Sequence, residues 1–293
     1  IFRELPDIPE SNIFTEPVGR NTAPSLAIAA ALAARDGEDA PMLCCPADHI
    51  IGDEEEFEKL VLSACDLAAE RDVLITFGIE PGYAATGYGY IETGENAAEL
   101  EGRSFHRVVN FHEKPDISKA KDYLHRGSFY WNSGIFVWRP SVFLAAWEHY
   151  VSDGVEPLRE ITESLGTSSE RSTVEEVYPR MPSISVDYAI LEKADNVLVT
   201  PADLAWNDVG SWDALFDLLP ENESGNIEKG YVKQIDSSGN IFFNPDGVTA
   251  AIGIEDTIVV VKDGTVLICR RGESQRVRDL INGLEKDGRD DLL

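Results

Sequence analysis

Residues 41–79, PMLCCPADHIIGDEEEFEKLVLSACDLAAERDVLITFGI, decide the fold that we predict for this chain. The first of them, 41–45, form a short apolar run that ends at Pro46 and predicts a buried strand. Residues 54–71 carry apolar side chains at helical spacing, and residues 72–79 form a second apolar run. A strand, a helix and a second strand in this order are typical of a parallel sheet that is covered by helices.

The same alternation continues on both sides of this segment. Residues 23–34 form an alanine-rich stretch that predicts a helix. Further along, strands and helices alternate as far as residues 211–219, SWDALFDLL, which predict a helix capped by Ser211. We therefore predict an α/β fold with a Rossmann-like, mostly parallel sheet covered by helices.

The alternation of strands and helices ends at residues 220–226, PENESGN. Short β runs follow over 230–270, separated by the turn sequences SSGN, NPDG and KDG, and residues 274–286 predict a closing helix. We find no convincing internal repeat in the sequence. We predict two domains, an α/β domain over 1–223 and a small β-rich domain with a closing helix over 224–293.

The chain of 293 residues carries 53 acidic and 25 basic side chains, a net charge of −28. This charge repels nucleic acid and anionic membrane surfaces, so we expect neither as a partner. No apolar run approaches the ~20 residues that a membrane-spanning helix needs, and there is no basic, apolar signal segment. We therefore expect a cytoplasmic protein, and we leave a homodimer open as its assembly.

The acidic residues are spread along the whole chain, and only 9 of the 25 basic residues are lysines. Such a surface repels itself unless salt screens the charges, and at molar salt the Debye length is only ~3 Å. An ordinary acidic protein with solvated faces is the alternative. The even spread of the charge favours a protein from a salt-loving organism.

Two carboxylates follow predicted strands, Asp48 in PADHII and Asp208 in AWNDVG. Because the carboxyl ends of parallel strands meet at one edge of a sheet, we expect the two side chains to lie close together. A divalent cation between them would remove their repulsion and the cost of burying them. Oxygen ligands favour Mg²⁺, and the 4 cysteines lack the C-x-x-C spacing of a zinc site. Each aspartate alone is about as well explained as a helix or turn cap.

The stretches FHEKP, ATGYGYI and YWNSGIF carry further candidates. Lys114 is a cation at a strand end that suits a phosphate, and Glu113 can accept hydrogen bonds from hydroxyl groups. Gly89 lets the backbone approach a ligand closely, and Asn132 and Gly134 lie beside aromatic residues where an amide can read sugar hydroxyls. A surface ion pair, a bulge and a buried amide are the structural alternatives.

Residues 16–25, EPVGRNTAPS, precede the predicted helix at 23–34. A helix N-terminus with polar caps attracts anions and carbonyl groups. Glu16 can accept the two adjacent N–H donors of a guanine edge. Asn21 and Thr22 are ligand contacts, caps of the helix, or both.

In this order, the motifs resemble those of the mannose-1-phosphate guanylyltransferases, also called GDP-mannose pyrophosphorylases, a family of sugar nucleotidyltransferases. The resemblance runs from about Asn12 to Leu218, and the β-rich tail is similar to the short C-terminal domain of the family. It implies a fold of the nucleotide-diphospho-sugar transferase type. The motifs that carry it are EPVGRNTAP, PADHII, TFGIEPGYAATGYGYIE, FHEKP, YWNSGIFVW, SISVDYAILEK and WNDVGSW.

The resemblance implies a role for each matching residue. Asp48 and Asp208 look like the metal carboxylates, and Lys114 looks like the ligand of the sugar phosphate; these three are the catalytic candidates. Substrate-binding roles are implied for the sugar ligands Gly89, Glu113 and Asn132, for the guanine readers Glu16 and Asn21, and in support for Asp187. Thr22 and Gly134, in the same motifs, are further substrate-binding candidates.

The implied reaction joins GTP and mannose 1-phosphate to give GDP-mannose and pyrophosphate, with Mg²⁺ as cofactor. Glu16 favours guanine over a pyrimidine, but the spacing of the motifs does not decide which sugar is bound. A related nucleotidyltransferase with another sugar or base is therefore one alternative.

The family opens with a strand and a Gly-rich, Arg-containing loop that cradles the triphosphate. The sequence starts at IFRELPDIPESN, which resembles the third strand–helix segment of the family. We therefore expect a fragment of an active enzyme that turns over poorly by itself. A non-catalytic, regulatory relative is the second alternative.

Overall fold

The computed structural model describes residues 6–9, 12–35, 37 and 39–289. It divides into two compact units. The first comprises Ile1–Ala47 and Ile51–Trp206, and the second comprises Asp48–Ile50 and Asn207–Leu293.

The first unit is built on a six-stranded sheet. Its strands are β1 (Met42–Cys44), β2 (Leu74–Ile79), β3 (Tyr90–Leu100), β4 (Arg103–His112), β5 (Phe129–Trp138) and β6 (Val197–Pro201). Their order in the sheet is β1-β5-β2-β6-β4-β3, and β3 also pairs with β5. The predicted α/β architecture, a central sheet covered by helices, is confirmed.

The directions of the strands correct one detail of that prediction, because the sheet is mixed rather than mostly parallel. β2 and β6 pair in parallel, whereas β5 runs antiparallel to both β1 and β2. β4 likewise runs antiparallel to both β6 and β3. Because a helix connects β1 and β2 in the sequence, the pattern predicts that these two strands pair in parallel. In the structure β5 lies between them, so they do not pair with each other.

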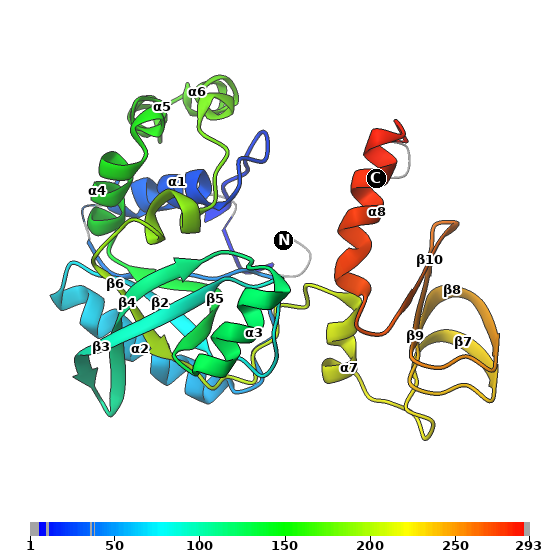
Figure 1. Cartoon of the computed structure of the whole chain (residues 1–293). Coiled ribbons are helices and arrows are strands. Elements are labelled where there is room, and N and C mark those ends of the chain that lie inside the picture. Colours follow the sequence, from blue (N-terminus) through cyan, green and yellow to red (C-terminus); the bar gives the residue numbers. More distant parts are fainter. Residues whose placement is uncertain (1–5, 10–11, 36, 38, 290–293) are drawn as a thin grey trace. The chain divides into compact units, whose positions relative to one another are not determined.

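Helices cover both faces of this sheet (Figure 1). They are α1 (Thr22–Arg35), α2 (Glu54–Glu70), α3 (Ile117–Arg126), α4 (Pro140–Tyr150), α5 (Ser152–Ser164), α6 (Glu170–Val177), the 3-10 helix η2 (Tyr178–Arg180) and the π-helix η3 (Asp187–Leu191). The alternation of side chains along each strand divides the core into two layers. Leu74 of β2 packs with α1, α4 and α5, whereas Ile75 and Phe77 pack with α2.

The second unit contains a four-stranded sheet of order β10-β9-β8-β7 and a helix near its end. Its elements are the 3-10 helix η4 (Trp212–Ala214), α7 (Leu215–Leu218), β7 (Ile227–Ile235), β8 (Ile241–Ile252), β9 (Thr257–Lys262), β10 (Thr265–Arg270), the 3-10 helix η5 (Ser274–Arg276) and α8 (Val277–Lys286). The predicted β-rich region and closing helix are therefore confirmed. Trp212 and Phe216 pack against Ile227 and Ile241, which is why this unit begins at Asn207, before the domain boundary that we predict at 224.

Two corrections concern this unit. Ser-Gly-Asn-Ile occurs twice, at 224–227 and 238–241, and the two copies stack: Asn226 and Asn240 are buried, and the backbone N–H of Asn240 donates to Asn226 Oδ1 at 2.9 Å. The chain therefore has a short structural repeat that we did not find in the sequence.

The predicted cap by Ser211 is wrong, because its side chain makes no capping hydrogen bond to η4.

In the part of the chain that the structure describes, every helix is too short or too polar to cross a membrane.

Candidate functional site

Asp48 and Asp208 lie on two segments that pair with each other in the second unit. Ile50 and Asn207 form an antiparallel bridge with N–H···O distances of 2.8 and 3.0 Å. This register places His49 opposite Asp208. Burial lowers the pKa of His49, and the negative charges of Asp48 and Asp208 oppose that shift, so both carboxylates lie near this imidazole. Asp48 is exposed and Asp208 is half-buried, so the cost of burial that we expected applies only to Asp208, and only in part.

The turn that follows Asp208 orients its carboxylate. Asp208 Oδ1 accepts a hydrogen bond from the N–H of Gly210 at 2.9 Å, and Val209 between them has a positive φ of 50°. A Cβ atom at Gly210 would lie 2.6 Å from Asp208 Oδ2, so a side chain here would displace the carboxylate from this orientation. The side chain therefore has a defined direction before any ligand binds.

This pair fits a hard divalent cation. Within the described residues, no group of three or more His, Cys, Asp or Glu side chains could hold a metal ion by itself. Mg²⁺ does not need one, because it is usually held by one or two carboxylates together with substrate phosphates and water. Asp48 and Asp208 would supply those two carboxylates.

A second cluster lies in the first unit and contains six of the predicted residues, Gly89, Glu113, Lys114, Asn132, Gly134 and Asp187. The carboxylate of Glu113 lies over Gly89, where a Cβ atom would be 2.6 Å from Glu113 Oε2. Lys114 Nζ pairs with Glu113 Oε1 at 2.8 Å, and Lys114 has a positive φ of 45°. A long side chain rarely adopts this backbone conformation, and such strain is concentrated at functional sites.

Asn132 joins this cluster through hydrogen bonds that define the orientation of its amide. Its Oδ1 accepts from the hydroxyl of Thr76 at 2.9 Å and from the N–H of Gly134 at 3.3 Å. Its Nδ2 donates to Asp187 Oδ1 at 3.0 Å, and its backbone N–H donates to Gly89 O at 2.9 Å. Gly134 has a φ of 72° at a register shift between β2 and β5, and it therefore supports Asn132 through the shape of the strand.

The electrostatics of this cluster suit a ligand that donates hydrogen bonds. Burial, together with the charge of Glu113, raises the pKa of Asp187 to about 6. Burial and the charges of Asp187 and Glu113 likewise raise the pKa of Glu192. Three carboxylates thus lie close together, and Lys114 pairs with one of them. Hydroxyl groups can satisfy the carboxylates, while Lys114 can take a phosphate.

Glu16, Asn21 and Thr22 lie where the chain enters α1, and Glu16 and Thr22 contact the segment 178–186 of the same unit. The hydroxyl of Tyr178 donates to Glu16 Oε1. Thr22 Oγ1 accepts from the N–H of Val186 at 2.9 Å, and Asn21 Oδ1 accepts from the N–H of Thr22 at 2.9 Å. Since Val186 precedes Asp187, the segment connects this group to the cluster around Asn132.

Three residues of these networks were not predicted as site residues from the sequence, Thr76, Tyr178 and Glu192. Thr76 left a signal, because it is the one polar side chain in the apolar run LITFGI. Tyr178 gave no such signal, because an aromatic residue after an amphipathic helix is expected to belong to the hydrophobic core. Glu113 and Lys114 directly follow β4, which runs antiparallel to β6. The pairing of β3 with both β4 and β5 is what brings Glu113 to Asn132.

The chain is similar to known proteins over most of its length. XanB, a xanthan biosynthesis protein of Xanthomonas campestris, is 36% identical over 95% of this chain and 58% of its own length. A mannose-1-phosphate guanylyltransferase of Escherichia coli K12 is 35% identical over 98% of this chain and 60% of its own length. The chain thus spans about three fifths of these curated relatives.

A solved structure from Thermus thermophilus, described as a mannose-1-phosphate geranyltransferase, has the same fold. It superposes with a TM-score of 0.79 at 29% identity, over 93% of this chain and 77% of its own length.

Two family models divide the chain between them. A MannoseP isomerase/GMP-like beta-helix domain matches residues 230–284, and a Nucleotidyl transferase domain matches residues 2–225, which cover the sheet, its helices and every predicted site residue. The chain therefore belongs to the Nucleotidyl transferase family.

Proposed function

We propose that the protein transfers GMP from GTP to mannose 1-phosphate, giving GDP-mannose and pyrophosphate. The observation that carries the proposal is the cluster of Gly89, Glu113, Lys114 and Asn132, which sets hydroxyl-accepting groups beside a cation. A sugar 1-phosphate has this combination of donors and charge. The names of relatives that match 95–98% of the chain support the choice of sugar and base.

In this reaction, a phosphate oxygen of the sugar phosphate attacks the α-phosphorus of GTP in line with the leaving group. A new P–O bond forms to that oxygen, and the bond from the α-phosphorus to the bridging oxygen of the β-phosphate breaks. Pyrophosphate leaves with the electron pair. Catalysis of this kind depends on positioning and on neutralising charge, and needs no covalent intermediate with the protein.

The residues divide these tasks. Lys114 binds and orients the attacking phosphate, and Glu113 and Asn132 hold the sugar hydroxyls, with Asp187 fixing the amide of Asn132. Glu16 accepts the donors of the guanine edge. Asp48 and Asp208 would hold Mg²⁺, which when bound neutralises the charge on the triphosphate. Because GTP is a cytoplasmic metabolite, we place the reaction in the cytoplasm.

A substrate panel tests this assignment. Each of mannose 1-phosphate and glucose 1-phosphate is paired with GTP, dTTP and UTP, and pyrophosphate release is measured with the full-length protein in Mg²⁺. We expect kcat/KM to be highest for GTP with mannose 1-phosphate. The carboxylate of Glu16 matches the N–H donors of guanine and faces the O4 acceptor of a pyrimidine, which should cost about tenfold or more in kcat/KM. A preference for a pyrimidine triphosphate would overturn the guanine assignment, and the absence of turnover with every pair would favour a regulatory relative.

We also propose that the protein is adapted to high salt, on the basis of its net charge of −28 and its scarcity of lysine. Molar KCl screens the repulsion between acidic side chains, so Tm should rise by about 5 °C or more between dilute buffer and molar KCl. Sucrose at the same osmolality is the control, because it stabilises by exclusion from the surface without screening charge. A Tm that is unchanged in KCl, or that rises as much in sucrose, would contradict the proposal.

A further inference from the structure

The entry to α1 is clamped to the segment that contains η2. Besides the bond from Tyr178 to Glu16, the guanidinium of Arg20 donates to the carbonyl of Pro179. Two more hydrogen bonds follow, from the N–H of Val186 to Thr22 Oγ1 at 2.9 Å and from the N–H of Ala23 to the carbonyl of Ile184 at 3.1 Å. The predicted base-reading residues are thus held by a segment more than 150 residues away in the sequence.

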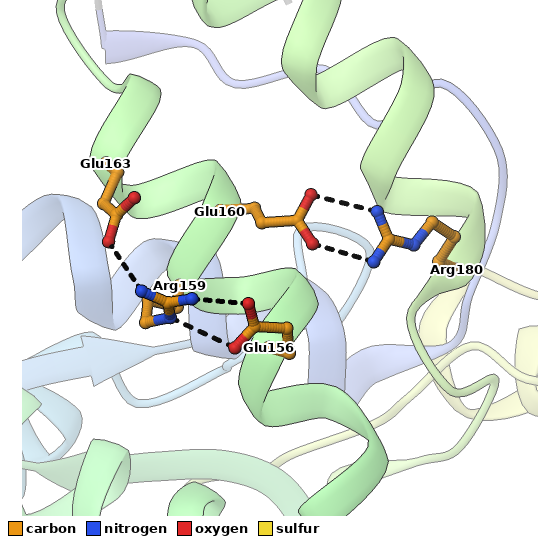
Figure 2. A network of polar contacts seen from close by, with 5 residues as sticks. All are labelled: Glu156, Arg159, Glu160, Glu163 and Arg180. Carbon is orange, nitrogen blue, oxygen red and sulfur yellow. Dashed lines mark hydrogen bonds and ion pairs between the residues drawn. The ribbon is translucent and has the colours of Figure 1, made fainter.

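The segment at η2 is itself anchored to α5. Arg180 makes a bidentate ion pair with Glu160, at 2.8 and 2.9 Å (Figure 2). Two parallel N–H···O bonds between a planar guanidinium and a carboxylate define an orientation as well as a distance. The anchor therefore fixes the backbone beside Tyr178.

Tyr178 differs from the other residues of the clamp because its hydroxyl bonds to the carboxylate of Glu16, the group that is proposed to read the base. Its side chain is fully buried, whereas Glu16 is half-buried. Burial, followed by the hydrogen bond to Glu16, raises the pKa of Tyr178, so the hydroxyl remains a donor at any physiological pH. A carboxylate that accepts this bond on Oε1 loses its freedom to rotate.

We propose that Tyr178 is a specificity-determining positioning residue, which holds the Glu16 carboxylate in the plane where its two oxygens accept the N1–H and N2–H groups of guanine. The inference rests on the proposed function, in which Glu16 reads the base. A carboxylate has about four lone-pair sites, so the bond from Tyr178 leaves enough of them for both guanine donors. A carboxylate that rotates would meet only one of the two donors at a time.

Kinetics with GTP and ITP test the proposal, because hypoxanthine keeps the N1–H of guanine and lacks its 2-amino group. With Tyr178→Phe, we expect kcat/KM for GTP to fall about tenfold, mainly through KM. The Glu16 carboxylate is then free to rotate, and its charge-assisted hydrogen bond to the 2-amino group of guanine is lost. The value for ITP should change much less, so the preference for GTP falls. The control is Tyr231→Phe, which removes an exposed hydroxyl in the second unit.

A second variant separates this inference from the proposed function. Glu16→Gln should lower the preference for GTP by itself, and Tyr178→Phe in that background should add no further loss of preference. If Tyr178→Phe alone leaves the ratio of GTP to ITP and the KM for GTP unchanged, the inference is wrong and the function stands. Equal losses with GTP and ITP, in both backgrounds, would mean that Tyr178 is merely structural and would also overturn it. If Glu16→Gln leaves base selectivity intact, the proposed role of Glu16 itself fails.

Discussion

Asp208→Asn in the full-length protein is expected to lower kcat by about 10³-fold at saturating Mg²⁺, GTP and mannose 1-phosphate. The change keeps the shape of the side chain and its bond to the N–H of Gly210, but removes one of the two carboxylates that would hold the cation. The charge that develops on the triphosphate would then lack part of its compensation. Asp48→Asn should show a loss of similar size.

The matched control for this prediction is Asp203→Asn. Asp203 is exposed, five residues before Asp208, and its replacement removes the same formal charge. Activity is measured as pyrophosphate release, and Mn²⁺ binding is followed by electron paramagnetic resonance with GTP present. If Asp208→Asn kept near wild-type kcat, or bound Mn²⁺ and GTP as the wild type does, the two-carboxylate site would be ruled out.

Lys114→Met is expected to lower kcat/KM for mannose 1-phosphate by about 10²-fold, mostly through a higher KM, with a much smaller change in the KM for GTP. Methionine keeps most of the apolar stem and removes the charge. The sugar phosphate would then approach a cluster in which Glu113 and Asp187 have lost the nearby cation. Repulsion from these carboxylates adds to the loss of the direct contact.

Lys119→Met is the control for this second prediction. Lys119 lies on α3, its side chain is 66% exposed, and its contact with Asp116 is long, at 3.9 Å. Initial rates are measured over a range of mannose 1-phosphate concentrations at fixed GTP. An equal rise in the KM values of both substrates would show a general loss of structure, and an unchanged KM for the sugar phosphate would show that Lys114 does not bind it.

The sequence alone could predict most of the elements and several residues of the site. Apolar periodicity is a local property, so the helix at 54–70 and the strands around it were predictable from their own side chains. Asp48, Glu113 and Lys114 were recognisable because they are polar residues that follow apolar runs, and Asn132 because it is a polar residue inside one. The strand β3 was harder to predict beyond Ile91, because its residues are mostly polar or small.

Only the tertiary structure decided how these local pieces meet. The insertion of β5 between β1 and β2 and the pairing of β3 with two neighbours join residues that are distant in the sequence. So do the hydrogen bonds that Asn132 accepts from Thr76 and donates to Asp187. The same holds for the contact between Tyr178 and Glu16. A side-chain pattern reports the period and the buried face of one segment. The partner of that segment, and the direction in which it runs, depend on non-local packing and hydrogen bonding, which no single segment encodes.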